Sequence, residues 1–307
     1  MDVQVKTVAG PLEYGYAPFW YEKTRALYFV NVYQSEVHKY NPVTKEHTIA
    51  RVGNKPVSFI VPIDDFNDKF LIGYGANLAA ITWDEVSGRT SSPKIIENVE
   101  SAPGNMVTDA KISPGGVLFV GSSGPGDLPS KNLKFNKAAL YSFKDCEMKT
   151  LIPNISASSG MAWSRTEKTF YFIDSPELRV ERYCYDKDAN ELTRGCVIYE
   201  FKDDALPGYP CGMTIDQDGH LWIGCYNGGQ VIKINPQSGK STAKIEIPQC
   251  PQITSVIFGG ENLDTLYVLS AAYKLDSKMN NAGFVFEVTG LGVKGSASKS
   301  LCLIPKK

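Results

Sequence analysis

The sequence contains no long apolar run and no segment typical of export. No stretch of its 307 residues approaches the roughly 20 consecutive apolar residues that a membrane-spanning helix needs. The first residues, Met1 to Val5, lack the basic start and the apolar centre of a secretory signal. We therefore expect a cytoplasmic protein with no membrane partner.

Residues for familiar nucleophilic or zinc chemistry are also scarce. The seven cysteines are an odd number without CxxC spacing, so they indicate neither a disulfide framework nor a zinc site. The three histidines, His38, His47 and His220, lie in outer-strand or turn patterns, which argues against a Cys–His nucleophile pair. The chain also lacks the Gly-x-Ser-x-Gly elbow of many serine hydrolases.

An excess of charge of either sign is missing too. The chain has 32 lysines and arginines against 33 aspartates and glutamates, which gives a net charge of -1. This balance excludes the basic surface typical of nucleic-acid binding. We expect a small-molecule ligand or substrate and no nucleic-acid partner, while the oligomeric state stays open.

Helical periodicity is nearly absent, and a β-type phrase recurs six times instead. Each copy has an apolar stretch, a turn with glycine or charged residues, and a second apolar stretch. The second stretches begin about 43 to 52 residues apart, which is the length of a four-stranded propeller blade. They begin at Leu27, Phe70, Leu118, Phe170, Leu221 and Leu266. The repeat predicts an all-β, six-bladed β-propeller in a single domain over residues 1–307.

Segments between the repeated phrases alternate polar and apolar residues, as half-exposed outer strands do. They cover residues 36–42, 179–186 and 230–240. The segment 121–136 is rich in glycine, proline and serine and predicts the longest loop.

Three phrases are more specific than the repeat. They are Trp222 to Pro236 (WIGCYNGGQVIKINP), Phe258-Gly259-Gly260 followed by Leu266-Tyr267-Val268, and Thr289 to Gly295 (TGLGVKG). With these phrases the chain closely resembles, from Gly15 to Gly295, the SMP-30/gluconolactonase family, which includes regucalcin and insect luciferin-regenerating enzymes. The resemblance implies a six-bladed propeller with a divalent metal on its central axis that hydrolyses sugar lactones or related esters.

The sequence departs from that family at the positions that the resemblance assigns to the metal and the substrate. The family has Gly-Glu-x-Pro in the first blade, with a glutamate ligand, where this chain has Tyr16 between Gly15 and Ala17. In the third blade, the arginine and the second asparagine of Asn-Arg-Phe-Asn-Asp-Gly-Lys are replaced by Met106 and Thr108.

Two further ligands implied by the resemblance are replaced in the fourth and fifth blades. Ser159 stands for the asparagine of Ser-Asn-Gly-Leu-x-Trp, and Cys211 stands for the aspartate of Pro-Asp-Gly. Calcium and magnesium prefer carboxylate and carbonyl oxygens, whereas a thiol is soft and a phenol is a poor substitute. We therefore expect no metal and no cofactor, and a pocket adapted to an apolar or aromatic molecule.

These positions define the predicted site. The predicted catalytic residues are Tyr16, Asp109 and Cys211, and the predicted substrate contacts are Met106, Thr108, Ser159, Phe19 and Ser122. Alternatives stay open: the replaced side chains fill a plugged axis, Cys211 is a small buried filler, and Asp109 bonds the backbone. If Asp109 faces the pocket, burial raises its pKa.

Three functions agree with this pattern. The first is a metal-independent enzyme that uses Tyr16 and Asp109 as acid and base in cyclisation, isomerisation or condensation of a small, largely apolar molecule. The second is a small-molecule binding protein without turnover. The third is a residual metal-dependent lactonase or esterase that uses other ligands.

Overall fold

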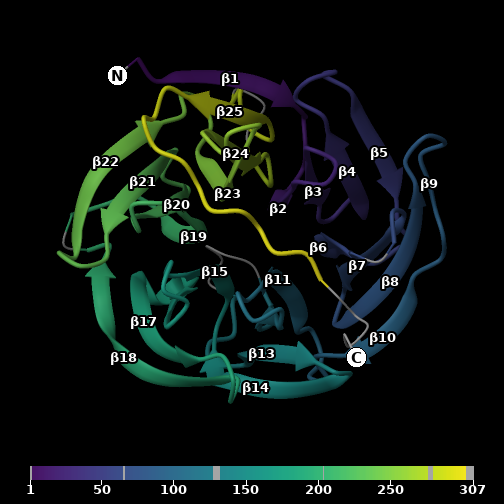
Figure 1. Ribbon diagram of the computed structural model, residues 1–307, viewed down its shortest axis with the longest axis horizontal. Coiled ribbons are helices and arrows are strands. Elements are labelled where there is room, and N and C mark those ends of the chain that lie inside the picture. Colours follow the sequence, from purple (N-terminus) through teal and green to yellow (C-terminus); the bar gives the residue numbers. More distant parts are fainter. Residues whose placement is uncertain (1, 65, 127–131, 203, 276–278, 302–307) are drawn as a thin grey trace.

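The strands form a ring around a central axis, with almost no helix (Figure 1). The computed structural model describes residues 2–64, 66–126, 132–202, 204–275 and 279–301. In these ranges the one helical element is the short 3₁₀ turn η1 (Ser175–Glu177). None of the helical residues described is part of a segment long and apolar enough to cross a bilayer. The expected all-β, propeller-like arrangement is confirmed.

Each repeated phrase forms a pair of antiparallel strands, the first next to the axis and the second outside it (Figure 1). The strands next to the axis are β2 (Gly15–Tyr21), β6 (Val57–Pro62), β11 (Met106–Ile112), β15 (Ser158–Trp163), β19 (Tyr209–Ile215) and β23 (Gln252–Gly259). Their partners are β3 (Ala26–Asn31), β7 (Lys69–Tyr74), β12 (Leu118–Ser123), β16 (Thr169–Asp174), β20 (Leu221–Tyr226) and β24 (Thr265–Ala271).

Further strands continue each pair toward the rim. The third strands are β4 (Glu36–Tyr40), β8 (Asn77–Asp84), β13 (Ala138–Lys144), β17 (Arg179–Asp186), β21 (Gln230–Asn235) and β25 (Val285–Thr289). The outermost strands are β5 (His47–Arg51), β10 (Lys94–Asn98), β14 (Glu147–Ile155), β18 (Glu191–Glu200), β22 (Lys240–Glu246) and β1 (Gln4–Ala9), and the short β9 (Arg89–Thr90) also pairs with β8.

Hydrogen bonding groups the described strands into five sheets instead of six separate ones. Three sheets have four strands, one has five, and one has eight. The eight-stranded sheet contains β19–β22 and also β23–β25 with β1, because β20 pairs with β23 at Tyr226 and Gln252. A single residue pair therefore fuses two groups of four strands.

Burial explains why these segments are strands. Every residue of β3, β12 and β20 is buried, as expected for a run of apolar and small residues packed on both faces. The outermost β22 is largely exposed. The predicted loop 121–136 begins too early, since β12 continues to Ser123, and residues 127–131 lie outside the described part of the chain.

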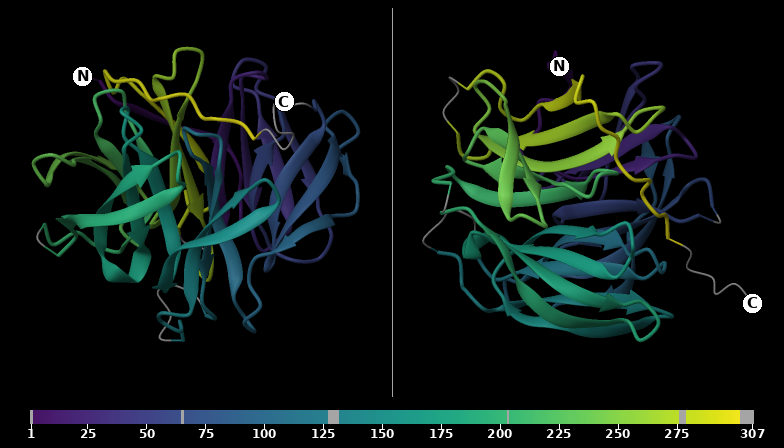
Figure 2. Two further views of the ribbon diagram at one scale, coloured as in Figure 1. Left: turned by 60° about the horizontal axis from the view of Figure 1, so that its bottom comes forward. Right: turned by 60° about the vertical axis from the view of Figure 1, so that its left-hand side comes forward.

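The two ends of the described chain complete the ring. The first strand, β1, pairs antiparallel with β25, with Gln4 opposite Thr289. After β25 the chain leaves the sheet and runs across one face of the ring, over the axis, toward β6 (Figure 1; yellow). Figure 2 shows that this segment stays on one side of the ring.

Candidate functional site

All six strands next to the axis carry a register irregularity in their pairing with the neighbouring strand. It lies between Tyr16 and Phe19 in β2 and between Val107 and Ala110 in β11. The other four are at Val57/Ile60, Ser158/Gly160, Pro210/Met213 and Ile253/Ser255. Such irregularities re-aim side chains and are common near binding sites. Here they lie between two cavities on the axis.

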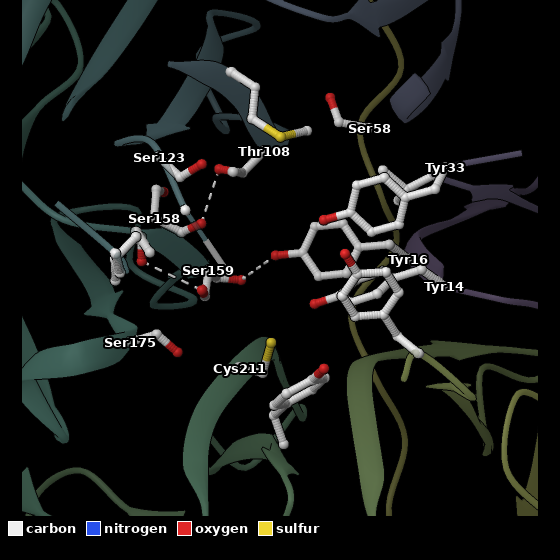
Figure 3. Close-up of a pocket in the computed structure, with 17 residues that line it drawn as sticks. Tyr14, Tyr16, Tyr33, Ser58, Thr108, Ser123, Ser158, Ser159, Ser175 and Cys211 are labelled. Carbon is white, nitrogen blue, oxygen red and sulfur yellow. Dashed lines mark hydrogen bonds between the residues drawn. The ribbon is translucent and has the colours of Figure 1, made fainter. Parts of the chain in front are cut away.

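The first cavity, which we call the tyrosine cavity, lies at the N-terminal ends of these strands and measures about 90 Å³. Aromatic phenols and small hydroxyls dominate its wall (Figure 3). The tyrosines are Tyr14, Tyr16, Tyr33, Tyr226 and Tyr273. The residues with hydroxyl or thiol groups are Ser58, Ser123, Ser158, Ser159, Ser175, Thr108 and Cys211.

The second cavity, which we call the lysine cavity, lies at the C-terminal ends of the same strands and measures about 310 Å³. Its wall is mainly apolar and includes Phe19, Phe59, Ile215 and Ile257. Lys111 of β11 also lines it. Residues 296–299 of the C-terminal segment form part of its wall.

The tyrosines of the first cavity form one aromatic wall centred on Tyr14. Its ring centroid is 5.9 Å from that of Tyr16, 5.5 Å from Tyr33, 6.1 Å from Tyr226 and 5.8 Å from Tyr273. Tyr33 and Tyr273 stack at 4.8 Å. These separations are in the range that favours aromatic pairs. The wall offers a planar ligand both ring faces and phenol groups.

The opposite wall of the tyrosine cavity consists of hydroxyl residues from β11 and β15. The Thr108 hydroxyl donates to the Ser158 carbonyl at 2.9 Å, and the Tyr16 hydroxyl reaches across to the Ser159 carbonyl at 3.5 Å (Figure 3). Within the described part of the chain, the buried hydroxyls of Ser58 and Ser158 have no hydrogen-bond partner. These two oxygen atoms keep unused hydrogen-bonding capacity, but they are buried against Gly73 and Gly121.

The side chains at the replaced positions stay neutral at pH 7. Burial raises the pKa of the Cys211 thiol to about 12. Burial also raises the pKa of the Tyr16 phenol well above its usual value, and the nearby Cys211 and Asp109 raise it further. A thiol with such a pKa is mostly the un-ionised form, which is a weak nucleophile and a poor metal ligand.

Two charged residues lie on β11 close to the irregularity. Asp109 is buried, at 5% exposure, and desolvation raises the pKa of its carboxyl to about 6, although Lys111 and the Ala110 amide oppose this shift. Desolvation lowers the pKa of Lys111 to about 8, and Asp109 partly counters it. The Lys111 amine donates to the Met213 carbonyl. Near neutral pH the two therefore form a buried, oppositely charged pair on one strand.

The tyrosine cavity does not suit a divalent cation such as calcium or magnesium. Among the described residues that line it, none carries a carboxylate; the side-chain donors are hydroxyls, a thioether and a neutral thiol. Hard cations need several oxygen ligands, usually including carboxylates. Of the nearby carboxylates, Asp109 is buried beside Lys111, and Asp174 accepts from the amides of Ser156 and Ala157.

A second group with metal-ligand residues serves the fold instead. Ligand atoms of Asp216, Asp218 and His220 lie within 4.8 Å of one another. The Asp216 carboxylate already accepts hydrogen bonds from the amides of Asp218 and His220 and from the Trp222 indole, and pairs with Lys233 at 3.1 Å. A cation is therefore not required to balance its charge.

The structure brings five of the eight predicted site residues to one cavity. Tyr16, Met106, Thr108, Ser159 and Cys211 line the tyrosine cavity. Their position tests no chemical role, so the roles stay predictions. Asp109 lies on β11 next to Thr108 and is electrostatically coupled to Tyr16 and Cys211.

The two other predicted contacts lie elsewhere. Phe19 lines the lysine cavity, because the irregularity after Tyr16 separates the two residues along β2. The Ser122 hydroxyl is fully buried, donates to the Glu100 carboxylate and accepts from the Ala139 amide at 3.0 Å. Ser122 is therefore not among the residues that line either cavity.

Four aromatic wall residues were not predicted from the sequence, although a signal exists. Tyr14 is two residues before Tyr16, so the two share one side of an extended chain. Tyr33, Tyr226 and Tyr273 each occur at or just after the end of a second repeat strand. Tyrosines at equivalent places in a closed repeat gather at one end of the axis.

Comparison with known proteins gives a consistent family. Residues 14–272 match the model of the SMP-30/Gluconolactonase/LRE-like region. Regucalcin of Danio rerio is 32% identical over 288 residues, which covers 92% of each chain. Regucalcin of Homo sapiens is 32% identical over 294 residues and covers 93% of this chain and 94% of its own.

Solved structures agree with this. A luciferin-regenerating enzyme superposes with a TM-score of 0.92 at 36% identity and covers 98% of this chain and 100% of its own. A calcium-binding regucalcin of Agrobacterium tumefaciens superposes with a TM-score of 0.82 over 97% of this chain and 96% of its own, at 21% identity, which bears on the fold alone.

Proposed function

Because this chain belongs to the SMP-30/gluconolactonase/LRE-like family, we propose that it is a small-molecule enzyme whose tyrosine cavity works without a metal. Its substrate is a small, largely apolar organic molecule, and its reaction is a cyclisation, isomerisation or condensation by acid–base catalysis. One observation carries the proposal: Tyr16, Ser159 and Cys211, at the positions that the resemblance assigns to the family's metal ligands, carry neutral side chains that line a single cavity.

The proposed acid and base are Tyr16 and Asp109. Desolvation brings the pKa of Asp109 to about 6, so near neutral pH this carboxylate is ionised yet basic enough to accept a proton. Burial also raises the pKa of the Tyr16 phenol well above its usual value, so the phenol keeps its proton. Near neutral pH one group is therefore ionised and the other protonated, as opposite roles in proton transfer require.

Cys211 has a different part in this proposal. A thiol with a pKa of about 12 is poorly suited to nucleophilic attack. We therefore assign it contact with the substrate and not covalent chemistry. Met106, Thr108 and Ser159 complete the binding surface, with the tyrosines as a platform for an aromatic or otherwise flat apolar group.

We also propose that the ring is a six-bladed propeller in one domain. The fused eight-stranded sheet separates into two four-stranded groups at the single pair of Tyr226 and Gln252. Counted in this way, each repeated phrase provides the two inner strands of one blade. The blade formed by β23, β24 and β25 takes β1 as its outer strand.

A binding protein without turnover is the second candidate. It is favoured by the lack of any residue ionised at neutral pH among the described residues that line the tyrosine cavity. A compound that binds in the cavity and is recovered unchanged supports this reading. A metal-dependent lactonase is the third candidate and needs ligands other than those in the cavity.

The experiment that tests the proposal combines metal analysis with an activity screen. Protein purified without chelator is analysed for calcium, magnesium, zinc and manganese, and its melting temperature is measured with and without EDTA. We expect no stoichiometric metal and no shift. Gluconolactone hydrolysis should stay orders of magnitude below that of a metal-containing relative, with or without added cations, because a metal centre lowers such barriers by several kcal/mol. One tightly held ion per chain overturns the proposal.

Substrates are sought with the same metal-free protein. Small apolar compounds that raise its melting temperature are incubated with it, and products are sought by mass spectrometry. Luciferin is a sensible first compound, since a relative of known structure is a luciferin-regenerating enzyme. Conversion without metal supports the enzyme, whereas binding without conversion of any compound supports the binding protein.

A further inference from the structure

The lysine cavity has features of a built ligand site, separate from the tyrosine cavity. Each strand next to the axis contributes to its wall, from β2 through β23. Wall residues include Phe19 of β2, Phe59 of β6, Ile215 of β19 and Ile257 of β23. At about 310 Å³, it is more than three times the volume of the tyrosine cavity. Apolar concave sites with a few polar groups are typical of small-molecule binding.

The C-terminal segment crosses this cavity and is attached on both sides of it (Figures 1 and 2). On one side Gly295 pairs with Asp216, and its amide donates to the Leu263 carbonyl at 2.8 Å. On the other side Leu301, 3% exposed, pairs with Ile63, and its carbonyl accepts from the Asp64 amide at 2.9 Å. Residues 296–299 between these attachments line the cavity.

The charged groups of the lysine cavity are mostly positive. Its lining includes Lys111 of β11 and the exposed Arg165 and Lys299. Among the described residues of the lining the one acid is Glu167, which pairs with Lys187 at 3.8 Å. Asp109, two residues before Lys111 on β11, is not among the lining residues. An amine in a cavity whose wall is mainly apolar matches a ligand with an apolar body and one anionic end.

We propose that the lysine cavity is a second ligand site that binds a small, mainly apolar monocarboxylate. The carboxylate pairs with the Lys111 ammonium, and the hydrocarbon part packs on the apolar wall beneath residues 296–299. The three cations near the cavity favour such an anion over a neutral molecule of the same shape. This site is independent of the function proposed for the tyrosine cavity.

The test uses octanoate as the probe and isothermal titration calorimetry on the full chain. We expect octanoate to bind, and Lys111→Met to weaken it about tenfold or more, because the variant keeps an apolar stem of similar length but loses the charge-assisted hydrogen bond. The neutral isostere 1-octanol should bind more weakly and be insensitive to Lys111→Met. Equal octanoate affinity in both proteins overturns the proposal.

Two matched variants locate the site. Asp109→Asn removes the carboxylate that competes for Lys111, so octanoate should bind more tightly, opposite in sign to Lys111→Met. Tyr16→Phe, in the tyrosine cavity, should leave octanoate affinity unchanged. If Tyr16→Phe weakened octanoate binding and Lys111→Met left it unchanged, octanoate would bind in the tyrosine cavity, and the proposal would be overturned.

A measurement on the unmodified chain covers the case in which Lys111→Met does not fold. Octanoate should slow amide hydrogen exchange in residues 295–301, because the ligand packs beneath this segment. 1-Octanol at the same concentration should protect them less. No detectable octanoate binding at millimolar concentration, or protection confined to the tyrosine cavity, overturns the proposal.

Discussion

The two cavities are built from the same six strands, yet their walls differ in chemistry. On β2, Tyr16 belongs to the tyrosine cavity and Phe19 to the lysine cavity. On β11, Thr108 belongs to the first and Lys111 to the second. The members of each pair are three positions apart, and the register irregularity overlaps the interval between them. A small change in position along an inner strand therefore moves a side chain from a hydroxyl-rich site to an apolar, cationic one.

The boundary between the cavities carries a cost in stability. Asp109 and Lys111 lie close to the boundary. The pKa of Asp109 is raised and that of Lys111 is lowered, and each shift favours the neutral form of the side chain. Since both shifts arise mainly from desolvation, mutual attraction offsets only part of the cost of burying the two charges. A buried pair that remains unfavourable in this way is more easily explained by a role in the cavities than by a role in folding.

The largest expected effect comes from giving the tyrosine cavity the family's metal ligands. Tyr16→Glu, Ser159→Asn and Cys211→Asp together should create a calcium site and abolish the native activity, because a hydrated cation replaces apolar surface. Calcium should raise the melting temperature of this variant and leave that of the parent unchanged. Octanoate binding in the lysine cavity should persist. An equal calcium shift in the parent contradicts the comparison.

The next effect separates the proposed acid from a wall residue. Tyr16→Phe removes only the hydroxyl that reaches the Ser159 carbonyl, so stability should change little. Turnover of the true substrate should fall by about 10² to 10⁴-fold if this hydroxyl transfers a proton. Ser58→Ala, which also changes one hydroxyl in the cavity wall, is the matched control and should have a smaller effect. Unchanged turnover in Tyr16→Phe leaves the binding protein as the better reading.

The pH dependence of stability tests the boundary itself. The carboxyl of Asp109 ionises near pH 6 in the fold and near its ordinary pKa of 3.8 when unfolded, so it contributes stability below pH 4 that is lost as pH rises to 6. The Asp109→Asn variant has no carboxyl to ionise, so its unfolding free energy does not fall in this way; the loss it avoids is up to about 3 kcal/mol. Leaving Lys111 unpaired lowers the unfolding free energy of the variant and reduces this advantage. Urea unfolding at several pH values measures the gain of the variant over the parent.

The expected sign is clear for this variant. Its advantage in unfolding free energy over the parent should grow between pH 4 and 6 and level off above pH 6. A constant difference across that range would mean that Asp109 titrates at its ordinary pKa, and the proposed base would lose its support.

The smallest effect concerns the cover of the lysine cavity. Leu301→Ala removes the buried apolar attachment of the C-terminal segment and should lower the unfolding free energy by about 2 kcal/mol. Amide exchange in residues 295–299 should speed up, and octanoate should bind more weakly. If amide exchange in residues 295–299 stayed as slow as in the parent, Leu301 would not be what holds this segment over the lysine cavity.

Much of the fold follows from the sequence, because apolar runs and turn residues repeat with the pattern that strands require. The stretch 179–186 matches β17, and each repeated phrase becomes an inner strand pair. The register irregularities are not visible in this pattern, since they depend on how neighbouring strands pack. That is why Phe19 was placed with Tyr16.

The candidate site was predicted from replaced ligands, and the structure brings most of them together. The glycines next to Ser159 and Cys211 have a packing role: a Cβ on Gly212 would lie 2.7 Å from the Cα of Ser255, and one on Gly160 would lie 3.0 Å from the Cys211 carbonyl oxygen. Their presence supports the packing of β15, β19 and β23 and says nothing about the site.

The pairing of β1 with β25 protects the molecule from aggregation through an open sheet edge. Val285 to Thr289 would be an open sheet edge if β1 were absent, and an apolar edge of this kind recruits strands from other molecules. Residues 4–9 occupy that edge with mostly exposed side chains, Lys6 among them. Because β1 and β25 lie far apart in the sequence, β25 keeps an open edge until the ring closes, so a partly folded chain offers this edge to other copies.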